Sequence, residues 1–263
     1  MSPALSFLLA AILVTSSALG AWFWHLRLKN AGVIDVVWGL NQALAATLFG
    51  LTGTGWGPRR FGIAAMVSLT GLRLTWHLTR RVLGHPEEGR YVALRQAWGQ
   101  EGANVPIKFL QFFLAQAVLV LLLAVPFYLV AQNPAVGFGA LEQAGLALFL
   151  IGFLGESLAD AQLKAFKADP AMRGKTCRRG LWRTSRHPNY FFEWLMWASY
   201  FVLALAAPYG WATVYAPLLM LFFLLKVTGV RYTEEQCLRS RGEDYALYQR
   251  ETSMFVPWFP KKA

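Results

Sequence analysis

Residues 109–130 read FLQFFLAQAVLVLLLAVPFYLV and contain no charged side chain. A helix of about 20 apolar residues spans the hydrocarbon core of a bilayer, so this stretch predicts a transmembrane helix. Backbone groups in lipid must find hydrogen-bond partners within the segment, which favours a helix, and the alternation typical of membrane barrel strands is absent. The stretch therefore indicates a helical membrane protein.

Similar apolar runs lie on both sides of it. The composition agrees, because 56% of the residues are hydrophobic and 15% are charged, whereas a soluble domain carries about 25% charged residues. We predict an all-α integral membrane protein in which residues 1–263 form a single domain. About seven transmembrane helices are expected, at 3–25, 31–53, 61–83, 108–131, 138–160, 190–208 and 211–230.

The first run ends in small residues that resemble a signal-peptide cleavage site, but residues 1–6 carry no positive charge, so we expect a retained helix. The net charge is +11. Cytoplasmic loops of membrane proteins collect Lys and Arg, which favours topology over nucleic-acid binding as the explanation. An external N-terminus and a cytoplasmic C-terminus place all Lys and Arg residues on cytoplasmic segments except Arg59, Arg60 and Arg73.

Ionisable side chains inside spanning helices are costly and mark a pathway or a site. Asp35 lies early in the second predicted helix, and Arg73 and His77 lie in the third. Asp35 either pairs with Lys29 or another helix or polarises a substrate within the bilayer. Arg73 needs a partner, for which Asp35 is a candidate, and His77 is either a satisfied core residue or a catalytic group.

A second polar set follows the fifth predicted helix and opens the sixth. Glu156 and Asp160 share a helical face, and so do Asn189 and Glu193. The first pair could be a salt-bridged helix end or one wall of a polar pocket. The sequence Arg186-His187-Pro188 precedes the sixth helix, whose free amides suit a phosphate or carboxylate.

The sequence motifs of several common nucleotide, zinc and hydrolase sites are missing. A glycine-rich dinucleotide loop, a phosphate-binding loop, a His-Glu-x-x-His zinc helix and a Gly-x-Ser-x-Gly elbow are all absent. Cys177 and Cys237 both fall on the predicted reducing side, so neither a structural disulfide nor a metal site is expected.

Residues 180–194, GLWRTSRHPNYFFEW, resemble the C-terminal domain of steroid 5-alpha-reductases and their bacterial relatives. The resemblance covers nearly all the chain, and the C-terminal signature region lies at about residues 140–260. The pair Glu234-Glu235, the later Tyr245 and Tyr248, and the sequence FVP at 255–257 are similar too. Upstream, the spacing of Asp35 to Trp38 and Gly39, and the sequence EGRY at 88–91, resemble the bacterial branch.

The resemblance implies a seven-helix reductase of the bacterial inner membrane that uses NADPH to reduce a carbon–carbon double bond conjugated to a ketone, as in 3-oxo-Δ4 steroids. The cofactor would lie in a polar cavity toward the cytoplasm. The lipid-like enone would enter from the bilayer, with no metal and no obligate protein partner. Matching positions imply a set of cofactor-binding residues, in which Lys167 replaces an Arg: Arg90, Asp160, Lys167, Arg186, His187, Asn189, Tyr190, Glu193, Arg231 and Glu235.

The resemblance also implies two catalytic candidates. Asp35 falls near the Glu that, with a Tyr, holds the steroid ketone in the family, and Trp76 and His77 stand where that Tyr is expected. A desolvated carboxylic acid with a raised pKa could donate a hydrogen bond to the ketone oxygen while the hydride arrives. That role requires Asp35 to be free of an ion pair.

Two other functions stay open. Isoprenylcysteine carboxyl methyltransferases and phospholipid methyltransferases share the Arg-His-Pro-x-Tyr segment and the late Glu pair, and would use S-adenosylmethionine. The number of spans, the positions of Asp160 and Glu193, and the Asp35 segment favour the reductase. A lipid-binding or transport protein would be expected to have a broken helix, for which Pro126 is a marginal candidate.

Overall fold

A computed structural model describes residues 1–261 of the chain. These residues fall into two compact units. Unit 1 comprises residues 1–138 and 206–210, and unit 2 comprises residues 139–205 and the chain from Trp211 onward.

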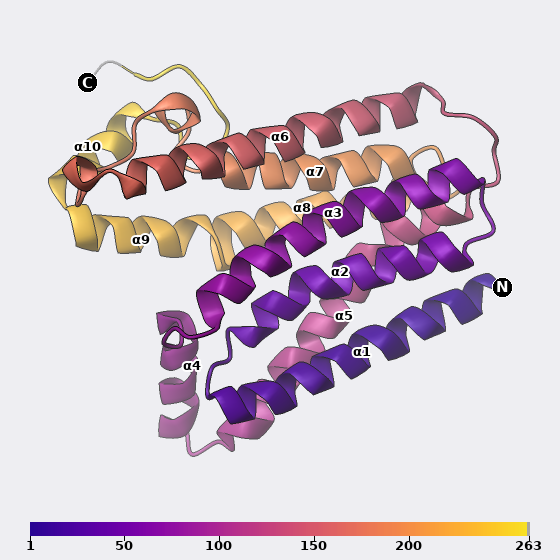
Figure 1. The fold of residues 1–263 in the computed structure, drawn as a ribbon, viewed down its shortest axis with the longest axis horizontal. Helices are drawn as coiled ribbons and strands as arrows, with labels where there is room; N and C mark the ends of the chain where they lie inside the picture. The colour runs from indigo at the N-terminus through magenta and orange to yellow at the C-terminus, as the bar shows by residue number, and fades with distance from the viewer. Residues whose placement is uncertain (262–263) are drawn as a thin grey trace. The chain divides into compact units, whose positions relative to one another are not determined.

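Unit 1 is a helical bundle in which α2 packs against α1, α3 and α5, while α4 packs against α5 (Figure 1). Helix starts carry the expected signals: the Ser2 side chain accepts a hydrogen bond from the Leu5 amide, and the Asn104 side chain accepts one from the Ile107 amide. The helices are α1 (Pro3–Leu28), α2 (Val33–Thr52), α3 (Gly57–Val82), α4 (Gly89–Gln100) and α5 (Val105–Gln132).

Small residues bring α2 and α3 close together. A Cβ atom added to Gly71 would lie 2.4 Å from the Gly39 carbonyl oxygen, so both backbones need glycine at the crossing. Thr75 Oγ1 donates to the Gly71 carbonyl at 2.8 Å and lies 3.2 Å from the Val36 carbonyl, which links the two helices one turn further on.

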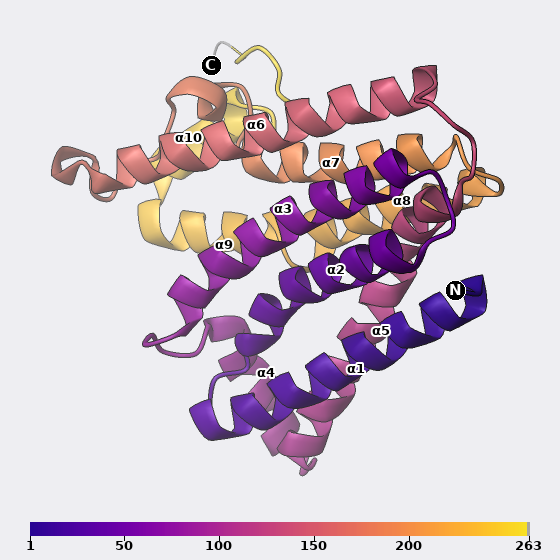
Figure 2. The same cartoon turned by 45° about the vertical axis from the view of Figure 1, so that its right-hand side comes forward.

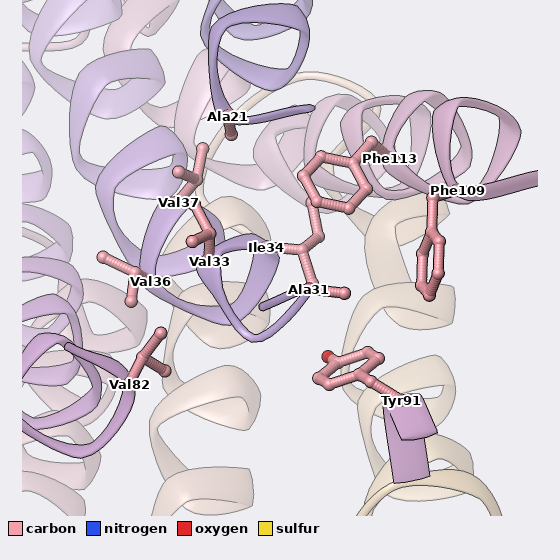
Figure 3. Close-up of a cluster of buried hydrophobic side chains, with 10 residues drawn as sticks. All are labelled: Ala21, Ala31, Val33, Ile34, Val36, Val37, Val82, Tyr91, Phe109 and Phe113. Carbon is pink, nitrogen blue, oxygen red and sulfur yellow. The ribbon is translucent and has the colours of Figure 1, made fainter. Parts of the chain in front are cut away.

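The apolar core at one end of unit 1 has members from each of the helices α1 to α5. Ile34 and Val37 of α2 pack with Phe109 and Phe113 of α5, and Tyr91 of α4 completes the cluster (Figure 3). All five side chains are buried. The short α4 is thereby fixed against the beginning of α2, which determines the position of its polar residues.

Unit 2 is built on α6 (Ala140–Ala168) and α7 (Pro188–Ala204), which lie side by side (Figures 1 and 2). The chain between them forms two short 3-10 helices, η1 (Pro170–Met172) and η2 (Gly180–Arg183). After η3 (Gly210–Val214), the chain continues through α8 (Tyr215–Phe222), the π-helix η4 (Phe223–Val227), α9 (Val230–Arg241) and α10 (Glu243–Glu251).

Within residues 1–261, five helical segments are long and apolar enough to cross a membrane: α1, α2, α5, α6 and the run Gly210–Arg241. These helices indicate a multi-pass membrane protein. The predicted third and sixth spans are the helices α3 and α7, but α3 carries several basic residues and α7 has 17 residues. The predicted total of seven spans therefore depends on these two.

The exposed side of α3 is nevertheless apolar. Phe61, Leu69, Leu72 and Trp76 are between 49% and 61% exposed, and the Arg80 guanidinium lies over the Trp76 ring. Such a surface suits contact with lipid tails, with the long basic side chain covering an aromatic ring near the helix end.

Candidate functional site

Asp35 is bound by two residues from the first turn of α4. The Arg90 guanidinium forms an ion pair with Oδ2 of Asp35, and the Tyr91 hydroxyl donates to Oδ1 at 2.8 Å. Burial and then the charge of Asp35 raise the pKa of Tyr91 well above its ordinary value, so the phenol stays protonated as the donor. Asp35 is therefore part of a closed polar contact between α2 and α4.

Further carboxylates fix the chain that leads into α4. Glu87 binds Arg95 at 2.8 Å and accepts the Ala31 amide at 2.7 Å. Glu88 lies 3.3 Å from Arg90 and 2.9 Å from Arg81, so two arginines share this carboxylate. Arg90 is bound mainly by Asp35, and its role in phosphate binding stays a prediction.

Two expectations about the catalytic residues change. The partner of Asp35 is Arg90 of α4, so the expected pairing with another helix is confirmed, and the partner is neither Lys29 nor Arg73. The ion pair also removes the condition under which Asp35 was expected to donate to a ketone. His77 is exposed on α3, and no hydrogen bond or ion pair joins it to another residue between positions 1 and 261.

In unit 2, the Glu234 carboxylate of α9 accepts hydrogen bonds from four residues. Arg186 binds it through Nε at 2.7 Å and Nη2 at 3.2 Å. His187 Nε2 and the Tyr245 hydroxyl both lie 3.0 Å from Oε1, and Gln249 Nε2 binds Oε2. This group, the Glu234 hub, joins α9 and α10 to the segment that opens α7.

The local sequence explains how Arg186 reaches the hub. Ser185 is wholly buried and its hydroxyl donates to the Phe255 carbonyl, while the Arg186 amide donates to the Ser253 carbonyl. Arg186 Nη1 then donates to the carbonyls of Gln249 and Thr252. Pro188 starts α7 directly afterwards, where a missing amide has no cost.

Two tyrosines of α10 complete the polar core of unit 2. Burial and then the charge of Glu234 raise the pKa of Tyr245, which keeps its hydroxyl a donor. Burial also raises the pKa of Tyr248, whose hydroxyl donates to the carbonyls of Trp182 and Ser185. Both phenols therefore act as fixed donors that hold neighbouring segments together.

The hub changes the expected role of Arg186 and His187. Four of the five N–H groups of Arg186 are directed to protein acceptors, and the His187 side chain is 3% exposed. Most of the donors expected to bind an anion at these two residues are therefore directed to protein acceptors instead. Tyr190, another expected cofactor residue, stacks on the His187 ring with the ring planes 5° apart.

The packing of α6 on α7 fixes the level of the other expected cofactor residues. An added Cβ would meet Leu203 at Gly145, Met196 at Gly152 and the Phe192 ring at Gly155. This antiparallel register puts Asp160 level with Asn189, and Glu156 level with Glu193. All four are half-buried, so the structure brings these four polar residues to the same end of the α6–α7 pair.

Three cations affect the Cys177 thiol, which lies in the chain between α6 and α7. Burial raises the pKa of Cys177, and the charges of Arg179, Arg241 and Lys167 oppose the shift. Against burial, the charge of Arg241 also contributes to lowering the pKa of Asp244. Arg231 and Glu235, in contrast, form an exposed pair on α9, 3.4 Å apart. Of the basic residues expected to bind the cofactor, Lys167 is the one that acts on Cys177 together with other positive charges.

Two residues that sequence reasoning missed lie in the middle of α2. Asn41 and Gln42 are 3% and 4% exposed. Among residues 1–261, no hydrogen-bond partner reaches Asn41 Oδ1, Gln42 Oε1 or Gln42 Nε2. The buried Asn133 of unit 1, by comparison, donates to the Ala206 carbonyl, while Gln132 has one buried amide nitrogen without a partner among residues 1–261. Buried polar groups without partners are rare and call for an explanation.

Comparison with known proteins gives a family without an assigned activity. A family model described as "Protein of unknown function (DUF1295)" matches residues 21–252. An uncharacterized protein of Schizosaccharomyces pombe (strain 972 / ATCC 24843) is 28% identical over 281 aligned positions, which cover 93% of this chain and 78% of the relative. No solved structure matches the chain.

We predict that Glu234→Gln destabilises the protein by about 3 kcal/mol, because it leaves the buried Arg186 charge without its counter-charge. Glu235→Gln is the matched control: its side chain is 51% exposed, and its loss should cost no more than about 0.5 kcal/mol. Thermal unfolding in detergent measures both. Equal unfolding temperatures for the two variants would contradict the structural role of the hub.

Proposed function

The chain belongs to the DUF1295 family, within the steroid 5-alpha-reductase-like superfamily, and from that premise we propose that it is an NADPH-dependent reductase of enone lipids, with 3-oxo-Δ4 steroids as the model substrates. NADPH, when bound, supplies a hydride for the β-carbon of the enone. A proton from solvent reaches the α-carbon, and the products are NADP⁺ and the saturated ketone.

The proposal depends on the observation that Asp160, Asn189 and Glu193 lie at the same end of the α6–α7 pair. Carboxylates and an amide on neighbouring helices can accept and donate hydrogen bonds to the ribose and carboxamide groups of a nicotinamide nucleotide. Lys167, Arg179 and Arg241 supply positive charge for its phosphates. The donors and acceptors of unit 2 therefore fit the cofactor.

The Glu234 hub bears on the competing function. The Arg-His-Pro segment and the late Glu pair occur in both reductases and membrane methyltransferases. Arg186, His187 and Glu234 bind one another here, so their presence is explained by folding and favours neither cofactor. The choice between the two cofactors therefore depends on Asp160, Asn189 and Glu193, whose positions match the reductases. NADPH is the first candidate and S-adenosylmethionine the second.

Gln42 is our candidate for a residue of unit 1 that binds a polar group of a lipid ligand. A buried side-chain amide can donate a hydrogen bond to a ketone oxygen. Gln42 Nε2 is buried and has no partner within residues 1–261, so a ligand oxygen would satisfy it. The Asp35 carboxylate, in contrast, is already bound by Arg90 and Tyr91.

Cofactor binding tests the proposal. NADPH fluorescence should change when the purified protein is added, and S-adenosylmethionine should not compete. Lys167→Gln should weaken NADPH binding about tenfold, through the loss of one charge-assisted contact to phosphate. Lys164→Gln removes an equal charge one turn earlier on α6 and should leave the affinity unchanged. Tight S-adenosylmethionine binding without NADPH binding would favour the methyltransferase instead.

Substitution of Gln42 tests the role of the amide. Gln42→Leu should weaken the binding of a 3-oxo-Δ4 steroid about tenfold, because a hydrogen-bond donor to the ligand oxygen is lost. The same change should leave the unfolding temperature equal or higher, since an unsatisfied buried amide is replaced by an apolar group. Equilibrium steroid binding and thermal unfolding give the two values. Unchanged steroid affinity in Gln42→Leu would remove this residue from the ligand site.

A further inference from the structure

Residues 254–259, MFVPWF, present large apolar side chains on the surface of unit 2. Met254, Val256, Trp258 and Phe259 are 42%, 53%, 67% and 81% exposed. We call these six residues the aromatic segment. An isolated exposed apolar side chain is ordinary, but four within six residues form a patch that suits a nonaqueous partner.

The aromatic segment is held in place by its backbone and by Phe255. The Trp258 amide donates to the Thr184 carbonyl at 2.9 Å, and the Ser185 hydroxyl donates to the Phe255 carbonyl at 2.8 Å. The Phe255 ring is buried against the rings of Phe191 and Trp194 in the first turns of α7. The protein therefore fixes the segment while its large side chains remain outside.

The position of the aromatic segment along α6 follows from the contacts between α6 and η2. On this helix the exposed surface is apolar up to Leu158, which is 50% exposed, and then carries Lys164 and Lys167. Trp182 Nε1 donates to the Ala159 carbonyl, and the Leu181 amide donates to Gln162 Oε1, so η2 lies where the surface of α6 changes. The aromatic segment is bonded to the residues that directly follow η2 and lies at the same level.

Two more features suit a bilayer surface. Arg183 directly precedes Thr184 and Ser185, which bind the aromatic segment, and Lys261 follows the segment in the chain. Both side chains are exposed, and neither forms an ion pair with another residue of the described chain 1–261. Pro257 and Pro260 have no backbone N–H group, which removes two donors that would otherwise need partners away from water. Basic residues beside aromatic rings are typical of the interface of bilayers with anionic lipids.

We propose that the aromatic segment is an interfacial anchor that places Trp258 and Phe259 in the headgroup region of a bilayer containing anionic phospholipid. The anchor fixes the start of α7, because the same segment holds Ser185 and, through its neighbour Ser253, Arg186. The inference rests on the membrane-spanning helices of the chain and is independent of the proposed reductase activity.

Depth-dependent quenching tests the anchor. Phe259→Cys and, separately, Val256→Cys are prepared with Cys177→Ala and Cys237→Ser, labelled with an environment-sensitive fluorophore and reconstituted into vesicles of phosphatidylcholine and phosphatidylglycerol. Glu243→Cys is the control, since the Glu243 side chain is 94% exposed. Labels at 256 and 259 should be quenched by lipid-borne nitroxide and be several-fold less sensitive to aqueous iodide than the control label.

Three results would overturn the proposal. Iodide quenching at 256 and 259 as strong as at 243 would place the segment in water. Protection from iodide without nitroxide quenching would indicate a protein contact, from a second copy or another partner. In vesicles that contain phosphatidylglycerol, nitroxide quenching that is equal for the parent and for Arg183→Gln with Lys261→Gln, and equal to that in pure phosphatidylcholine vesicles, would remove the anionic lipid from the assignment.

Discussion

The cost of leaving a polar group unpaired away from water is the constraint on which this structure depends. Burial of a polar group costs free energy unless another residue supplies its hydrogen bonds. Glu234 meets this demand through four neighbours, and Asp35 meets it through Arg90 and Tyr91. The Asp35 contact holds α2 and α4 together in unit 1, and the Glu234 contact holds α9 and α10 to the start of α7 in unit 2.

This constraint separates two kinds of polar residue. Arg186 and His187 both bind Glu234. The structural role of this contact explains why the motif can occur in enzymes that use different cofactors. Asn41 and Gln42 are buried without satisfying each other, and no residue between 1 and 261 completes their hydrogen bonds. A polar group that the protein itself leaves unsatisfied is the better candidate for ligand binding.

Much of the helical architecture could be predicted from the sequence, because apolar runs of membrane length specify helices with little ambiguity. The run 211–230 was expected as one helix, but the π-helix Phe223–Val227 and Gly229 divide it. Pairs between distant residues could not be read from spacing: Arg186 and Glu234 are 48 positions apart. Gln42 was overlooked because an uncharged amide hardly changes the appearance of an apolar run.

The central claim is that the polar ends of α6 and α7 hold a nicotinamide nucleotide for reduction of a lipid enone. Its most direct measurement uses reconstituted protein, NADPH with deuterium at the nicotinamide 4-position, and a panel of 3-oxo-Δ4 steroids, with mass spectrometry of the products. The account predicts a saturated ketone with one cofactor-derived deuterium at the β-carbon. Transfer of a labelled methyl group from S-adenosylmethionine to a lipid, with no saturated ketone from any steroid, would contradict it.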